Sequence, residues 1–407
     1  MKRFLLLCGV VALSAGQPAR AWEGDTFQPI ISYGEYYNSN VFRLPQNGSI
    51  VLTQNGVPLL LQGPAADSDQ VLDFGAKVDW RPGRQQILLR ATKSLVRYSR
   101  FSVINYDGSN LLSQWNWRFA RRWKGRVGVT QQVAQTSFNY IELPVVVNNL
   151  NTDRRAFASI DWLLDPRWTV GVHTADSNLL NSSVYEYYLN YNERSLTEIL
   201  EYRTPKGSSL RTELREADSF YPNQQIVSGS AVDNSYRENT FDVVGTWAPT
   251  AKTGITAQVG LLERLNKNIP QRNFSGVISK LTTAYAPTGN TSLSLSVYQQ
   301  PAGEQLAYAS FVLDTGASLN AAWQMTPVVT LQASLMRDQY NYKGDPGIIF
   351  GLPHRVDNDE SGALTLVYKP QPMVAVDIGL QAGQQKSTIP FYGYRFYSVF
   401  ANVRLDL

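Results

Sequence analysis

Charged side chains recur at alternate positions in several apolar stretches of this 407-residue chain, and they are its strongest chemical signal. Arg211, Glu213 and Arg215 form the densest group, with three charges on one face of one expected strand. Fork-like arginine hydrogen bonds beside carboxylates can hold hydroxyl-rich solutes in a hydrated pore, although opposite charges can equally brace a polar wall. The same rule gives the full set of candidate solute-path residues: Arg90, Arg118, Arg126, Arg155, Asp161, Arg211, Glu213, Arg215, Asp242, Asp314, Asp377 and Arg404.

Residue types that carry out covalent chemistry are scarce. The chain has one cysteine, Cys8, and two histidines, His173 and His354. This composition excludes disulfide scaffolds, cysteine-rich zinc sites and thiol catalysis, and no set of nucleophile, base and orienting residue stands out around either histidine. We therefore expect no enzymatic activity, no cofactor and no metal site.

The elements that must position these charges are strands, because apolar and polar residues alternate with a period of two from end to end. Leu313–Trp323 and Val374–Gly383 are two examples. This pattern predicts strands with one apolar face and one small, polar or charged face. Beyond the N-terminal segment, no stretch approaches the roughly 18 apolar residues of a transmembrane helix. A membrane-spanning chain of this kind would have to be a barrel.

A repeated mark, an aromatic residue followed by a short turn, divides the chain. Trp80, Trp247 and Tyr368 each precede such a turn, and eight marks occur in all. Sixteen strands flank eight turns, and one more at each end gives an all-β, transmembrane, antiparallel up-and-down barrel of about 18 strands. The count falls to 16 if the terminal segments do not pair. The aromatic residues predict an interfacial girdle, with short turns facing the periplasm and long loops outside.

The N-terminus predicts export from the cytoplasm. Lys2 and Arg3 precede an apolar run, and Ala19–Ala21 gives a cleavage pattern, so residues 1–21 are a predicted signal peptide. Residues 22–407 then form a single outer-membrane barrel domain in a bacterial outer membrane, with outer-membrane lipid around it. The chain has 37 lysines and arginines against 33 aspartates and glutamates, with no basic stripe, so we expect no nucleic-acid partner.

The long connection after the first expected strand contains an unusual apolar hairpin. Two turn pairs, Asn47 with Gly48 and Asn55 with Gly56, lie in it, and the second pair separates two apolar runs. We expect this hairpin to fold into or over the pore and act as a gate, with a partner-binding flap as the alternative. Tyrosines such as Tyr340 and Tyr342 crowd the outer connections, where they would stack on sugars or belong to the outer girdle.

The segment Phe27–Pro45, and within it Asn40–Pro45, resembles the opening of β-barrel porins associated with exosortase systems, the extracellular polysaccharide biosynthesis transporter family. The aromatic turn marks and the length also fit that family. The resemblance implies an outer-membrane component of Gram-negative bacteria that helps a newly made polysaccharide leave the periplasm. It also implies contact with periplasmic or inner-membrane polysaccharide export machinery.

Three functions follow, of which polysaccharide export through a passive channel is the leading one. The first alternative is a general or sugar-specific diffusion porin, and the second is an adhesive or structural barrel.

The alternating residues of the last segment, from Val399 to Leu407, resemble the strand signal by which the outer-membrane barrel assembly machinery recognises its substrates, although the final residue is leucine rather than phenylalanine.

Overall fold

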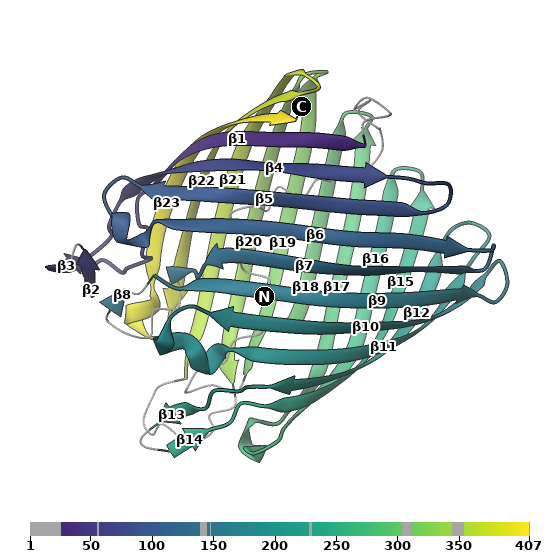
Figure 1. The fold of residues 1–407 in the computed structure, drawn as a ribbon, viewed down its shortest axis with the longest axis horizontal. Coiled ribbons are helices and arrows are strands. Elements are labelled where there is room, and N and C mark those ends of the chain that lie inside the picture. The colour runs from purple at the N-terminus through teal and green to yellow at the C-terminus, as the bar shows by residue number, and fades with distance from the viewer. Residues whose placement is uncertain are drawn as a thin grey trace.

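The chain forms one closed antiparallel barrel of 18 strands (Figure 1). The computed structural model describes residues 26–54, 57–138, 145–146, 148–227, 230–302, 311–343 and 354–406, so the predicted signal peptide, residues 1–21, lies outside the described residues. The first strand pairs with the second barrel strand on one side and with the last on the other, which closes the barrel. The predicted fold class and the count of 18 strands are confirmed.

The barrel strands follow one another around the wall in chain order. Their bounds are β1 (Phe27–Asn38), β4 (Asp67–Trp80), β5 (Gln86–Tyr98), β6 (Tyr106–Phe119), β7 (Trp123–Gln135), β9 (Leu150–Leu163), β10 (Trp168–Asn181), β11 (Tyr191–Arg203), β12 (Ser209–Phe220), β15 (Tyr236–Thr250), β16 (Thr253–Asn266), β17 (Phe274–Thr288), β18 (Thr291–Ala302), β19 (Phe311–Thr326), β20 (Val329–Lys343), β21 (Val356–Gln371), β22 (Val374–Ser387) and β23 (Tyr394–Asp406).

Alternation along each strand gives the barrel two different surfaces. Large apolar side chains such as Phe241, Val259 and Leu261 lie on one face, where they are about half exposed, and the candidate solute-path residues lie on the other. An exposed apolar belt is stable only against lipid, so the apolar face is the outside of the barrel and the polar face lines the lumen. In the described part of the chain, no helix is long and apolar enough to cross a membrane.

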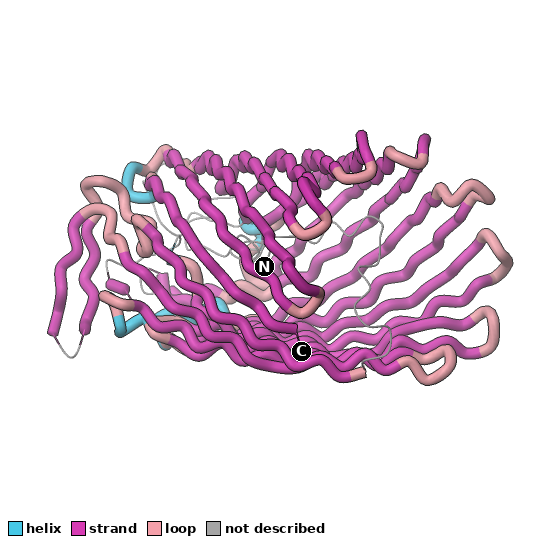
Figure 2. The backbone as a smooth tube through the Cα atoms, turned by 90° about the horizontal axis from the view of Figure 1, so that it is seen from above, coloured by secondary structure: helices cyan, strands magenta, loops and turns pink. Residues whose placement is uncertain are grey.

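Short turns and long loops lie at opposite ends of the barrel (Figure 2). Phe27 pairs with Val78, close to the first short turn, and Asp406 pairs with Ile30, so the described part of the chain begins and ends at the short-turn end. Aromatic side chains such as Trp80 and Trp247 are exposed on the outer face at this end, and Trp123 and Trp162 stack with ring centroids 5.3 Å apart. This arrangement is typical of an interfacial girdle.

The remaining elements belong to the long loops. They are the strands β2 (Ser49–Gln54), β3 (Val57–Gln62), β8 (Val145–Val146), β13 (Gln225–Val227) and β14 (Ser230–Val232), and the 3₁₀ segments η2 (Ser102–Ile104), η4 (Val184–Leu189), η5 (Pro270–Arg272) and η6 (Pro390–Tyr392). Strands β2 and β3 form the expected hairpin, and β2 also pairs in parallel with β8.

The Asn40–Pro45 stretch has a structural role at the closure of the barrel. The Asn40 side-chain nitrogen donates to the carbonyls of Leu44, at 2.8 Å, and of Arg395 on β23, at 3.0 Å, while its oxygen accepts from the Leu44 amide. Phe42 is buried against Phe101. The motif therefore links the first loop to the last barrel strand and builds a small apolar core beside β2.

We predict that Ile50→Val loosens this loop core by about 1 kcal/mol, because one buried methylene is lost from a closely packed site. Ile50 is almost fully buried, whereas Leu60 on the paired strand of the same hairpin is exposed. Limited proteolysis of the hairpin should therefore become faster in Ile50→Val. Leu60→Ala serves as the control and should leave the rate unchanged; equal rates in both variants would contradict the packing assignment.

Candidate functional site

The candidate solute-path residues all lie on strands, at positions that alternate with the lipid-facing residues, so all twelve line the lumen. The lumen wall is not uniform around its circumference. One sector carries exposed cations, the next carries ion pairs between neighbouring strands, and a third carries buried aspartates. These three sectors differ in whether their charges are available to a passing solute.

The cationic sector extends from β4 to β9. Lys77 pairs directly with Arg90, and the same row of the ladder continues through β6 and β7 to Arg155 on β9. Arg126 and Arg118 lie on rows nearer the short turns, and Arg118 pairs directly with Lys124. The register thus gathers six basic side chains on one wall of the lumen. Carboxylates share this wall, because Asp161 pairs directly with Lys124 in the ladder and Asp153 lies two residues before Arg155 on the same face of β9.

The four predicted arginines of this sector are open to solvent. Within the described part of the chain, Arg90, Arg118, Arg126 and Arg155 form no salt bridge, and all four are exposed. The nearest interaction is the Arg126 guanidinium, 5.5 Å from the centre of the Phe157 ring. Unpaired guanidinium groups in a lumen attract anions and can bind carboxylates with two parallel hydrogen bonds.

The second sector, from β11 to β16, holds Arg215 in a network of ion pairs. Its two guanidinium nitrogens lie 2.5 Å from Glu193 and 2.9 Å from Glu238, and Glu238 also lies 2.5 Å from the buried Arg264. Arg211 pairs with Glu213 on its own strand at 2.6 Å. Arg215 therefore braces the wall, because both of its sides already contact carboxylates.

The third sector, from β18 to β22, buries its aspartates toward the long-loop end. The Tyr298 and Tyr340 hydroxyls donate to Asp338, at 2.5 and 3.2 Å, and the Tyr342 hydroxyl donates to Asp357 at 3.2 Å. The expectation that Tyr340 and Tyr342 serve the outer surface is wrong, because both point inward and are buried.

The other predicted lumen residues have local partners. His173 lies 3.0 Å from Asp161, Gln258 donates to Asp242 at 3.1 Å, and Arg404 lies 3.2 Å from Asp406. Asp314 is buried on β19, and Asp377 lines the lumen on β22.

Sequence reasoning missed Glu238, Arg264 and Asp338, although all three occupy polar positions of alternating strands and the same rule would have found them. It also missed Arg355, which lies just before β21 and carries no such signal.

The predicted gate residues lie in and beside the β2–β3 hairpin. Gly48 forms a turn in which its amide donates to the Pro45 carbonyl at 3.0 Å, whereas Asn55 and Gly56 lie outside the described residues. Figures 1 and 2 both place the hairpin beyond the ends of the barrel strands, at the long-loop end. Its role as a gate, with Asn47 and Gly48 at its base, stays a prediction.

The loop segment η4 gives a pH prediction. Burial raises the pKa of Glu186, and the hydrogen bond that Asn149 donates to it at 2.7 Å offsets part of this rise. A raised carboxyl pKa means that Glu186 favours the folded loop most below its unfolded pKa, and this contribution is lost as pH rises through the raised value. Hydrogen exchange over residues 183–190 should therefore show less protection at pH 7 than at pH 4.

Glu186→Gln is the matched variant for this prediction, because a glutamine keeps the acceptor for Asn149 but does not ionise. Its protection, corrected for intrinsic exchange rates, should not change between the two pH values. A variant that keeps the wild-type pH dependence would assign that dependence to another group.

Comparisons with known proteins support the fold. No family model matches the chain, and no curated protein sequence does. Solved structures from Pseudomonas aeruginosa are similar in fold: the outer membrane protein OpdK (9% identity, TM-score 0.50) and OccK2 (OpdF) in complex with glucuronate (8% identity, TM-score 0.52). The matches cover 94% of this chain in both cases, and 99% and 98% of those chains. OpdK has also been solved with vanillate, with a TM-score of 0.51 at 8% identity.

Proposed function

We propose that this chain is an outer-membrane diffusion channel for small hydrophilic solutes, with a preference for anions. Barrels of about 16 to 18 strands leave an aqueous channel, whereas smaller barrels fill their interior with side chains. The observation that carries the proposal is the set of four exposed arginines on one lumen wall, Arg90, Arg118, Arg126 and Arg155, which form no salt bridge among the residues that the structure describes. They place four positive charges along the path. We expect no enzymatic activity.

Small carboxylates are the solutes to test first. Unpaired arginines match the planar geometry of a carboxylate, and the similar barrels OpdF and OpdK were solved with glucuronate and vanillate, respectively. The identity between these chains and this one is too low to transfer a binding site. The choice therefore depends on the chemistry of the lumen.

Export of an extracellular polysaccharide has weaker support than diffusion of small solutes. No family model supports the resemblance to the exosortase-associated transporters, and the Asn40–Pro45 stretch on which it depends has a structural role in the first loop. An export role and its periplasmic or inner-membrane partners stay predictions. Carbohydrate in the periplasmic and external fractions of a deletion strain tests them: loss outside with accumulation inside would favour export.

The proposed channel is tested with the full purified chain in a planar bilayer and in liposomes. Stepwise conductance is expected, with a reversal potential that shows anion preference in a salt gradient. Liposomes should swell faster in glucuronate than in a neutral sugar of similar size, and slowly in a larger oligosaccharide. A chain that inserts as a folded barrel but conducts no ions would overturn the proposal.

A further inference from the structure

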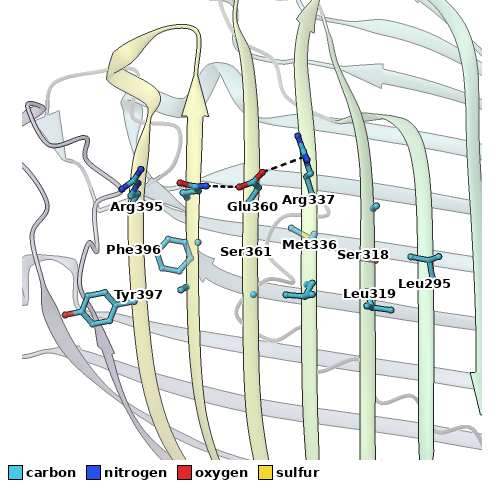
Figure 3. Close-up of a pocket in the computed structure, with 16 residues that line it drawn as sticks. Leu295, Ser318, Leu319, Met336, Arg337, Glu360, Ser361, Arg395, Phe396 and Tyr397 are labelled. Atoms are coloured by element: carbon cyan, nitrogen blue, oxygen red, sulfur yellow. Dashed lines mark hydrogen bonds and ion pairs between the residues drawn. The ribbon is translucent and has the colours of Figure 1, made fainter.

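An open groove of about 940 Å³ lies on the lipid-facing surface of β18 to β23, away from the lumen. Its floor and walls include Leu295, Leu319, Leu335, Gly362 and Ala382. Figure 3 shows its polar end, with Arg395, Glu360 and Arg337 at one level across neighbouring strands. The groove therefore combines an apolar channel with charged groups at one end.

The strand register explains this division. One row of directly paired, outward-facing residues begins at Ala317 and then carries the polar groups: Arg337, Glu360, Gln384 and Arg395. The next row toward the short turns is apolar: Leu319, Leu335, Gly362, Ala382 and Tyr397. The change from charge to apolar surface thus occurs within one step of the ladder, as at the boundary between lipid headgroups and acyl chains.

The middle positions of the apolar row hold the two smallest side chains, Gly362 and Ala382, which leaves a shallow hollow that the Leu335 side chain borders closely. A Cβ atom added to Gly362 would meet the Leu335 Cδ2 atom at 3.1 Å and the Ser334 carbonyl oxygen at 3.7 Å. Leu335 and Tyr397, both more than half exposed, flank the hollow. An extended hydrocarbon chain can lie in such a hollow and remove this apolar surface from contact with mobile lipid.

The polar row carries cations that remain available to an anion. Arg337 and Glu360 lie 3.8 Å apart with both side chains exposed, which makes a weak pair. Within the described part of the chain, Arg395 and Lys386 form no salt bridge, and both are exposed. Lys386 lies one row farther toward the long loops, so three cations surround a single carboxylate.

We propose that this groove binds one phosphate-bearing acylated lipid of the outer leaflet. The cations at Arg337, Lys386 and Arg395 hold the anionic headgroup, and an acyl chain lies over Gly362 and Ala382. This inference rests on the proposed membrane setting of the barrel, but not on the solute that passes through it. The cations fit a headgroup phosphate, and the hollow fits its chain, so the two requirements can be tested separately.

The test uses the full chain in nonionic detergent, titrated with dioleoyl phosphatidylglycerol or with dioleoyl phosphatidylcholine and followed by native mass spectrometry. Wild-type protein should retain one phosphatidylglycerol molecule more tightly than phosphatidylcholine. Arg337→Glu with Arg395→Glu should weaken phosphatidylglycerol binding at least about tenfold, since each surface charge contributes about fivefold. Gly362→Leu fills the hollow and leaves all cations in place, and it should also weaken phosphatidylglycerol binding. Ala382→Leu replaces it if Gly362→Leu does not fold.

Arg154→Glu provides the matched control, because Arg154 is an exposed outward-facing cation on β9, across the barrel from the groove. It should bind the lipid like the wild type. Equal affinity for both lipids would overturn the proposal, as would a Gly362→Leu variant with unchanged binding. A shift in oligomeric state without a loss of lipid would instead identify a contact between copies. Conductance is recorded for every variant, so failure of the channel and failure of the lipid site give different results.

Discussion

Reversing three lumen charges, Arg90→Glu with Arg126→Glu and Arg155→Glu, should turn an anion-preferring channel into a cation-preferring one. These arginines lie on β5, β7 and β9 and, within the described part of the chain, form no salt bridge, so each reversal changes the potential of the lumen directly. We expect the permeability ratio of chloride to potassium to fall by roughly tenfold or more. The reversal potential in a salt gradient should change sign.

The same change should slow glucuronate more than a neutral sugar of similar size. Like charges on the lumen wall repel the carboxylate, whereas the polar lining that hydrates a neutral sugar is otherwise unchanged. Comparing the two swelling rates within each variant separates charge selectivity from a narrower pore. Equal slowing of both solutes would indicate that the variant is constricted or misfolded.

Arg154→Glu is the control for this prediction because Arg154 is adjacent to Arg155 on the same strand. Arg154 points outward and donates to Gln131 at 2.8 Å, while Arg155 points into the lumen. The single control variant should keep the wild-type reversal potential. If Arg154→Glu alters selectivity as much as Arg155→Glu does alone, the assignment of the two faces of β9 is incorrect.

The fold was predictable because its signals are local. Alternation places every second residue on one face without knowledge of the neighbouring strand, and aromatic residues such as Trp80 and Trp247 mark each short turn within a few residues. Eight such turns determine both the number of strands and the placement of the termini. The β2–β3 hairpin was also predictable, since its signal is a turn between two apolar runs.

The partners of the lumen charges were not predictable, because they depend on register. Arg215 is bracketed by Glu193 and Glu238 on the two neighbouring strands, and only the pairing of β11, β12 and β15 brings them together. Sequence alone shows that Arg90 and Arg215 both face the lumen. It does not show that Arg215 is held in ion pairs whereas Arg90 forms no salt bridge within the described residues, and this difference decides their roles.

The inward tyrosines were missed for a related reason. Tyr340 and Tyr342 lie near the end of β20, and a sequence places such residues equally well in a girdle or in a loop. Their side chains turn inward. Tyr340 donates to Asp338, two residues earlier on the same strand, and Tyr342 donates to Asp357 on β21. A tyrosine has one apolar body and one polar end, so its partner decides which surface it joins.

Arg355→Met should destabilise the folded barrel by about 3 to 5 kcal/mol, because it leaves a buried carboxylate without its counter-ion. The side chains of Arg355 and Asp357 are almost completely buried, and their closest approach is 2.6 Å. The guanidinium also lies 3.5 Å from the ring centre of Tyr392 in η6, so it joins the start of β21 to the last loop. Reversible unfolding in urea, monitored by tryptophan fluorescence in lipid vesicles, measures the change.

The double variant Arg355→Met with Asp357→Asn should recover most of that loss. An asparagine no longer carries the charge but can still accept a hydrogen bond from Tyr342 or Gln385, which donate to Asp357 at 3.2 and 3.1 Å. Arg203→Met breaks an exposed pair with Glu201 and should change stability by less than about 1 kcal/mol. If the double variant is no more stable than Arg355→Met, removing the charge of Asp357 has recovered no stability. The main role of Arg355 would then be packing against Tyr342 and Tyr392.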